Sequence, residues 1–193
     1  MARLPLRSIE DAPEAARPAL ETAQKNNGYL PNLLRVLANA PVALETYLTV
    51  SGINARASLT LPEREVVQIT AAAIHGCGFC VAGHTAIATK KAGLDGETVG
   101  ALRELEPLAD ARLNAIAVFT REVIAARGAV SDGALEKFLA AGFNEGAALE
   151  VVLGVSLATL CNFANNLGQP PLNRELEPYR WEPRPNASSV AAE

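Results

Sequence analysis

Helix start and stop signals divide most of this chain into segments of helical length, and this pattern constrains the fold more than any other feature. The clearest start is the stretch TLPERE, where Thr60 can cap a helix and Pro62 suits its first turn. Glu63 completes a capping box with Thr60. We expect this helix to run to about Gly76, because glycine favours a break in the helical pattern.

The same signals recur along the rest of the chain. In GYLPNLLRVLANAP, residues 28–41, they predict a turn, a short helix and the start of another helix near Pro41. Further helices are predicted at residues 78–91, 95–105, 109–127, 131–141 and 144–166. Alanine and leucine dominate and only 5% of residues are aromatic, so the expected fold is an all-α helical bundle.

We expect a single domain over residues 1–178, followed by a strap and tail at residues 179–193 that is Pro-rich and then small and polar. The helical part also contains an internal similarity. REVVQITAAAIHGC around Glu65 resembles LEVVLGVSLATLCN around Glu150, since each places Glu-Val-Val before small apolar residues. We interpret this as a degenerate internal helical duplication.

Charge and hydropathy narrow the range of partners. The net charge of −4 gives no electrostatic reason to expect nucleic acid or an anionic membrane as a partner. The N-terminus lacks the apolar run of a signal peptide. The apolar stretch at 151–164 is interrupted by Ser156, Thr159 and Asn162, and we interpret it as too short for a membrane span. A cytoplasmic location with reduced thiols is therefore expected.

The segment IHGCGFCVAGHTAIA, residues 74–88, holds both histidines of the chain and two of its three cysteines. Cys77, Cys80 and His84 are spaced so that they share one face of a helix. A helix N-terminus would favour the thiolate form of these cysteines, and a neighbouring histidine and glutamate could move the proton. Glu65, on the preceding helix, is either such a general base or a solvated charge near the start of its helix.

The cysteine pair allows three other interpretations. A c-type haem attachment requires His directly after the second cysteine, but Val81 occupies that position. A structural zinc site is less favoured, because zinc typically supports small segments without the ample apolar core present here. Its ligands would be Cys77, Cys80 and His84, with His75 or Cys161 as the fourth. Two buried structural cysteines are the third possibility. We expect no metal or cofactor, and we expect Cys161 to be inert packing.

The stretch EREVVQITAAAIHGCGFCVAGHTAIATKKAG is similar to the core of the carboxymuconolactone decarboxylase-like superfamily, and in particular it resembles the alkylhydroperoxidase AhpD-like branch. The pattern of that branch is Glu, eleven residues, Cys-x-x-Cys, three residues and His. Glu65, Cys77, Cys80 and His84 fill these positions. The flanks GYLPNLLRVLANAP and FANNLGQPPLN resemble the peroxidase-related members, so the resemblance extends over roughly residues 20–180.

This resemblance implies an all-helical homo-oligomer, a trimer or hexamer. It further implies that Cys80 attacks a peroxide and that Cys77 resolves the sulfenic acid as a disulfide. Glu65 and His84 would form the proton relay, and a disulfide reductant protein or small thiol would restore the dithiol. AhpD has a histidine between its cysteines, whereas this chain has Phe79, which implies weaker peroxidase activity or a different oxidant.

The leading hypothesis is therefore a cytoplasmic, thiol-dependent antioxidant enzyme that reduces hydroperoxides through a Cys77–Cys80 disulfide. One alternative is a decarboxylase or lactone-handling enzyme that uses Glu65 and His84 as acid and base. The other is a redox sensor whose thiols become oxidised without turnover.

Overall fold

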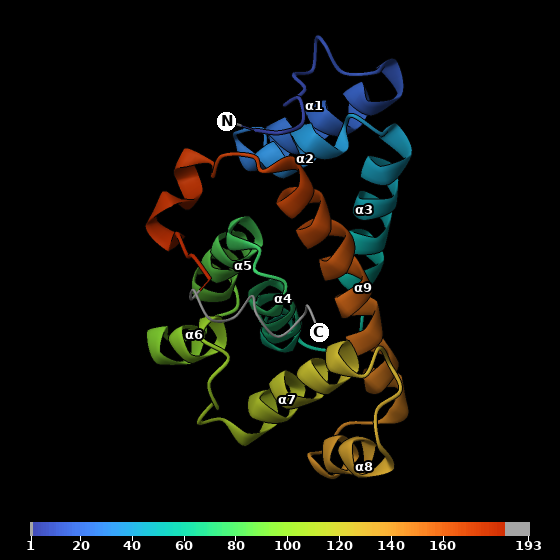
Figure 1. The fold of residues 1–193 in the computed structure, drawn as a ribbon, viewed down its shortest axis with the longest axis vertical. Helices are drawn as coiled ribbons and strands as arrows, with labels where there is room; N and C mark the ends of the chain where they lie inside the picture. The colour runs from blue at the N-terminus through green and yellow to red at the C-terminus, as the bar shows by residue number, and fades with distance from the viewer. Residues whose placement is uncertain (1, 184–193) are drawn as a thin grey trace.

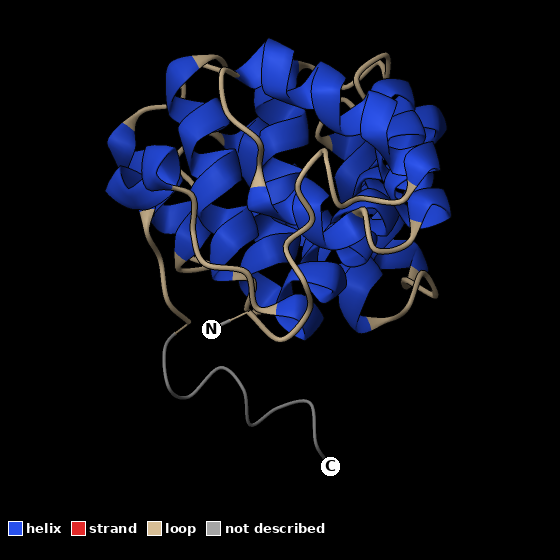
Figure 2. Cartoon of the chain, turned by 90° about the horizontal axis from the view of Figure 1, so that it is seen from above, coloured by secondary structure: helices blue, strands red, loops and turns tan. Residues whose placement is uncertain are grey.

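A computed structural model describes residues 2–183, and this part of the chain consists of nine α-helices and two short 3-10 helices without a β-strand (Figures 1 and 2). The α-helices are α1 (Arg17–Asn27), α2 (Asn32–Leu37), α3 (Pro41–Asn54), α4 (Leu61–Ile74), α5 (Gly78–Lys90), α6 (Gly96–Arg103), α7 (Ala111–Ala125), α8 (Asp132–Ala140) and α9 (Glu145–Gly168), and the 3-10 helices are η1 (Glu14–Ala16) and η2 (Arg174–Tyr179). The all-α prediction is confirmed.

Two hydrophobic clusters form the core, and α4 and α9 contribute to both. One cluster lies between α4, α7, α8 and α9 and contains Ile69, Ile116 and Phe138. The other lies between the N-terminal helices, α5 and α9, and it contains all three cysteines. Helix α9 extends along most of the molecule, from α2 to α8 (Figure 1). The cysteine motif is therefore part of a packed core rather than of a surface loop.

Helix α4 begins at the predicted capping box. The Glu63 side chain accepts a hydrogen bond from the Thr60 backbone N–H at 2.7 Å, and the Thr60 hydroxyl accepts one from the Glu63 N–H at 3.5 Å. The helix ends at Ile74, and Gly76 adopts a φ of +64°, which suits glycine. Helix α5 then starts at Gly78, so the predicted break between the two helices is confirmed.

The N-terminal helix α1 was not predicted from the sequence. It is mostly polar, and only Leu20 and Ala23 are buried, so the apolar periodicity is weak. Its ends nevertheless carry the usual signals, with Pro18 in the first turn and Gly28 in the left-handed conformation at its C-terminal end. These two residues could have revealed it.

The two stretches of the internal similarity both form helices, but they differ where a break was expected. Helix α4 stops before Gly76, whereas α9 continues through Asn162 and Asn165 to Gly168. The duplication therefore stays a prediction, as does the single domain over residues 1–178. Residues 184–193, the tail of the predicted strap, lie outside the described residues.

With 24 residues, α9 is longer than the interrupted stretch noted in the sequence, and its length and composition alone would allow it to cross a membrane. The central helix of a soluble protein can meet the same criterion. Here α9 packs against α2, α3, α4, α5 and α7, as expected for a helix at the centre of a bundle.

Candidate active site

A buried carboxylate and a histidine form a close pair between α4 and α5. Glu65 Oε2 lies 2.8 Å from His84 Nδ1, and the side chains are 6% and 23% exposed respectively. Glu65 is therefore buried rather than solvated, and its role as a general base stays a prediction. With Nδ1–H donating to the carboxylate, Nε2 is the basic nitrogen of the ring. This arrangement fixes the orientation of the histidine for proton transfer.

The two cysteines of the motif lie at the start of α5. Cys77 is the N-terminal capping residue of that helix, and Cys80 lies within its first turn. Both are free thiols, and both are buried. A hydrogen bond with Cys80, followed by burial, raises the pKa of the Cys77 thiol far above its usual range. Cys77 is thus a neutral thiol in the resting site.

The third cysteine lies beside the motif, although the sequence predicted only inert packing for it. Cys161 Sγ, on α9, lies 3.3 Å from Cys80 Sγ. Asn165, one turn further along α9, donates from Nδ2 to Cys80 Sγ at 3.2 Å and lies 4.0 Å from Cys161 Sγ. Cys161 is buried in the core, as expected for a packing residue, but the packing of α9 against α5 also places its sulfur against the motif. Its inertness stays a prediction.

These neighbours determine the ionisation of Cys80. The contact with the Cys161 thiol raises the pKa of Cys80 most strongly, and burial raises it further. Hydrogen bonds from Cys77 and Asn165 oppose this effect, but the pKa of Cys80 remains well above its ordinary value. Since the thiolate is the nucleophile, Cys80 requires a base to remove its proton.

A pocket of about 810 Å³ opens onto this site. Cys80, Cys161 and His84 line it, whereas Cys77 is not among the described residues that do. Its walls come mainly from α1, α2, α3 and α5 and are largely apolar, with Phe79 among them and Lys90 on the same lining. A small organic molecule entering the pocket would meet Cys80 rather than Cys77.

Tyr47 is a further pocket residue, and it was not predicted from the sequence. It lies on α3, and burial together with the neighbouring Cys161 raises the pKa of its hydroxyl well above its usual range. It is therefore a neutral hydrogen-bonding group beside the sulfurs. The chain gives no local signal for this role, because α3 and α9 meet α5 only in the folded structure.

His75 lies apart from the pair of Glu65 and His84. Its Nδ1 is 3.0 Å from Asn162 Oδ1, and its ring packs edge-on against Phe163 with centroids 5.0 Å apart. Among residues 2–183, no group of three or more His, Cys, Asp or Glu side chains is arranged to hold a metal ion. His75 therefore serves the contact between α4 and α9.

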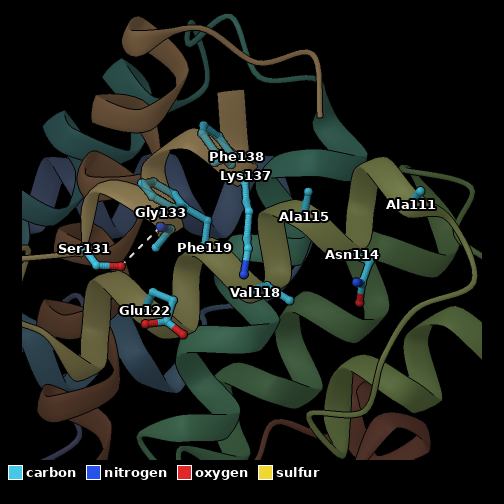
Figure 3. Close-up of a pocket in the computed structure, with 11 residues that line it drawn as sticks. Ala111, Asn114, Ala115, Val118, Phe119, Glu122, Ser131, Gly133, Lys137 and Phe138 are labelled. Carbon is cyan, nitrogen blue, oxygen red and sulfur yellow. Dashed lines mark hydrogen bonds between the residues drawn. The ribbon is translucent and has the colours of Figure 1, made fainter. Parts of the chain in front are cut away.

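A second pocket, of about 440 Å³, lies between α7 and α8. Figure 3 shows Lys137 and Glu122 among its lining residues, with Ser131 accepting a hydrogen bond at the start of α8. Its lining includes neither histidine nor cysteine, so it offers no thiol chemistry. The 810 Å³ pocket is the candidate active site.

The strap covers the start of α5. A Cβ atom on Gly78 would lie 2.6 Å from the backbone oxygen of Trp181, and the Trp181 Nε1–H donates to Glu104 at 3.3 Å. Helix η2 packs against α5 as well, and Figure 1 shows the two side by side. Glycine at position 78 is therefore required by the close approach of the strap.

Residues 41–121 match the model of the carboxymuconolactone decarboxylase family. This range contains Glu65, both cysteines of the motif and His84. Among curated proteins, none matches the chain.

Solved structures extend the similarity to nearly all of the chain. An uncharacterized peroxidase-related protein with an alkylhydroperoxidase AhpD core, from Ralstonia eutropha JMP134, superposes with a TM-score of 0.82 at 22% identity, covering 91% of this chain and 94% of that one. An uncharacterized peroxidase-related protein from Silicibacter sp. TM1040 gives 0.76 at 21% identity, covering 90% and 92%. The debrominase Bmp8 gives 0.72 at 16% identity, covering 91% and 94%. The chain therefore has the AhpD-like fold, and its resemblance to the carboxymuconolactone decarboxylase and AhpD-like superfamily is confirmed.

Proposed function

We propose that this protein is a thiol-dependent peroxidase that reduces organic hydroperoxides, with Cys80 as the attacking thiol. The observation that carries the proposal is that Cys80 and His84 line one pocket, while the buried Glu65 holds the His84 ring at 2.8 Å. A buried thiol of raised pKa beside an oriented imidazole suits base-assisted nucleophilic attack.

In the proposed reaction, His84 accepts the Cys80 proton and the thiolate attacks the terminal peroxide oxygen. The S–O bond forms, the O–O bond breaks, and the alkoxide leaves as an alcohol with the proton returned by His84. The Cys77 thiol then attacks the Cys80 sulfenic sulfur, which releases water and forms the Cys77–Cys80 disulfide. A reductant protein or small dithiol returns both cysteines to thiols by exchange.

The pocket favours an organic hydroperoxide over hydrogen peroxide. At about 810 Å³ it is far larger than hydrogen peroxide requires, and apolar side chains such as Leu33, Leu48 and Ile87 line it. Burying a hydrocarbon tail against these residues would contribute binding energy that hydrogen peroxide cannot supply. We expect a lower KM for cumene hydroperoxide than for hydrogen peroxide.

A second candidate is reductive dehalogenation of a halogenated aromatic compound. A cysteine-to-alanine variant of the debrominase Bmp8 has been solved in complex with 2,3,4-tribromopyrrole. The same apolar pocket, with Phe79 and Tyr47 in its lining, suits a flat ring. Two thiols and an aryl bromide would give the reduced arene, bromide, a proton and the disulfide. Bromide release from a brominated pyrrole distinguishes this activity from peroxide reduction.

The decarboxylase alternative would use Glu65 and His84 without a change in thiol state, and the sensor alternative would oxidise the thiols once without turnover.

The decisive experiment follows cumene hydroperoxide consumption with excess dithiothreitol. Wild-type protein should turn over repeatedly, while Cys80→Ser should lose at least a hundredfold in rate. Single-equivalent oxidation would favour the sensor. Unchanged consumption in Cys80→Ser would overturn the proposal.

We also propose that the protein is a cytoplasmic homo-oligomer. Six large apolar side chains are exposed on α3 and α9: Val42 (73%), Ile53 (42%), Leu149 (72%), Val152 (40%), Phe163 (55%) and Leu167 (58%). The four on α9 recur at helical spacing along one face of that helix. An exposed apolar face of this kind is typical of an interface between subunits.

A further inference from the structure

We infer that Cys161 is a third redox thiol of this site and forms a disulfide with Cys80, linking α9 to α5. The inference rests on the proposed function, because hydroperoxide is the oxidant that converts Cys80 into the electrophile. It adds a second partner for Cys80 beside the Cys77 of the motif.

The geometry brings the two sulfurs close to bonding distance. Cys80 Sγ and Cys161 Sγ are 3.3 Å apart, and a disulfide bond is about 2.05 Å long. Closing this gap needs a movement of little more than about 1 Å, which a change of side-chain torsion angles can supply. Both residues are buried and both line the pocket. Cys161 therefore faces the side of Cys80 that meets the oxidant.

Asn165 is an independent sign that this pair of sulfurs is a reactive site. Its side chain is 3% exposed, and its Nδ2 contacts Cys80 Sγ at 3.2 Å while lying 4.0 Å from Cys161 Sγ. Its Oδ1 is buried and has no hydrogen-bond partner among the described residues. Leaving such an oxygen unpaired costs free energy, which the N–H contact with the sulfurs has to offset in this orientation of the amide. An N–H donor there stabilises negative charge on either sulfur during exchange.

The chemistry balances without a further reagent. Hydroperoxide converts Cys80 to the sulfenic acid, and the Cys161 thiol attacks that sulfur. The S–S bond forms, the S–O bond breaks, and hydroxide leaves with the thiol proton as water. Cys77 can then attack the Cys80 sulfur of this disulfide, which releases Cys161 as a thiol and moves the disulfide into the Cys-x-x-Cys motif. Cys161 thereby shields the sulfenic acid from further oxidation.

The test uses the full-length Cys77→Ser variant, treated with one equivalent of cumene hydroperoxide and quenched with N-ethylmaleimide. We expect loss of both remaining thiols, a mapped Cys80–Cys161 peptide by mass spectrometry, and recovery with dithiothreitol. Dimedone labelling of Cys80 should be at least tenfold lower than in the double variant Cys77→Ser/Cys161→Ser. Equal dimedone labelling in the two variants, with no linked peptide, would overturn the inference. Circular dichroism confirms that both variants are folded.

A second oxidant separates this inference from the proposed function. Diamide oxidises neighbouring thiols without a peroxide. One outcome is that diamide forms a Cys80–Cys161 disulfide in Cys77→Ser while hydroperoxide leaves the wild-type thiols intact. This outcome would support the pairing of the two cysteines and reject the peroxidase function. Wild-type turnover with hydroperoxide, but no Cys80–Cys161 link with either oxidant, would reject the pairing alone.

Discussion

The carboxylate of Glu65 is buried, and its one described partner is the imidazole of His84. In Glu65→Gln the amide oxygen can still accept from Nδ1–H, so the ring keeps its orientation while the negative charge is lost. Since general base catalysis contributes about 10²–10⁴-fold, we expect kcat/KM for cumene hydroperoxide to fall by about 10². Steady-state kinetics would measure this. Glu136→Gln, on the exposed side of α8, is the matched control. A Glu65→Gln rate within twofold of wild type would contradict the relay.

The raised pKa of Cys80 predicts how its reactivity depends on pH. A raised pKa leaves less thiolate at a given pH. The ordinary pKa of cysteine is about 8.5. The rate of Cys80 alkylation by iodoacetamide should therefore keep increasing with pH beyond that value. The Cys161 contact is the largest cause of the shift. Cys161→Ala should therefore move the profile to lower pH. Mass spectrometry of the Cys80 peptide provides the readout, and a wild-type profile that levels off below pH 8 would be inconsistent with this account.

Local sequence predicts only part of this site. Cys77, Cys80 and His84 are close in sequence, and their helical spacing alone predicts that they share one face of a helix. Glu65 could be singled out as a carboxylate on the preceding helix, and the family pattern includes it, but its burial became visible only in the structure. Cys161 and Asn165 escaped prediction because their contact with Cys80 depends on how α9 crosses α5, more than 80 residues away in sequence.

At the level of helices, Glu63 joins the start of α4 to α7. Burial raises the pKa of the Glu63 carboxyl group. Hydrogen bonds from the Thr60 N–H and from Arg112, whose Nε lies 2.7 Å from Glu63 Oε1, lower this pKa by more, so the net shift is downward. A lowered folded-state pKa stabilises the fold above the unfolded-state value of about 4.3, and this contribution is lost as the pH falls through the folded-state pKa. Arg112 is half exposed, so solvent screens the pair.

Glu63→Gln should consequently lower the free energy of unfolding by about 1 kcal/mol at pH 7, because the charge is lost while the cap to Thr60 can persist. The difference from wild type should shrink below pH 4 as the wild-type carboxyl becomes protonated. Urea unfolding at pH 7 and pH 3 measures both values. A difference that is the same at the two pH values would show that charge is not the cause.

The strap over α5 can be tested through a single methyl group. In Gly78→Ala the new Cβ would lie 2.6 Å from the Trp181 carbonyl oxygen, which is backbone and must move. We expect α5 to persist and the strap to lift, with a red shift in the emission of Trp181, the only tryptophan in the chain. Gly96→Ala is the matched control, because Gly96 begins α6 and its Cβ would meet nothing within 4 Å. Identical spectra for the two variants would rule out the contact.

For the molecule as a whole, the sequence predicted most helices but not how they are grouped. Capping and stop signals act within a few residues, which is why the boundaries of α4 and α5 agree so closely with expectation. The division of the core into two clusters depends on which faces meet. One such contact is Gly154, where a Cβ would lie 2.9 Å from Val67 Cγ1. This close approach of α9 to α4 is a tertiary property.

The exposed apolar face of α9 leads to the prediction for the assembly. If copies of this chain associate through that face, replacing a central apolar side chain by a charge would force an unpaired charge into the interface, which is costly. Leu149→Arg and Phe163→Arg should therefore shift the proposed trimer or hexamer to smaller species, as measured by light scattering coupled to gel filtration. Val118→Arg, an exposed apolar position on α7 beside the second pocket, is the matched control and should leave the mass unchanged. Dissociation by Val118→Arg alone would place the interface on α7 and α8 instead.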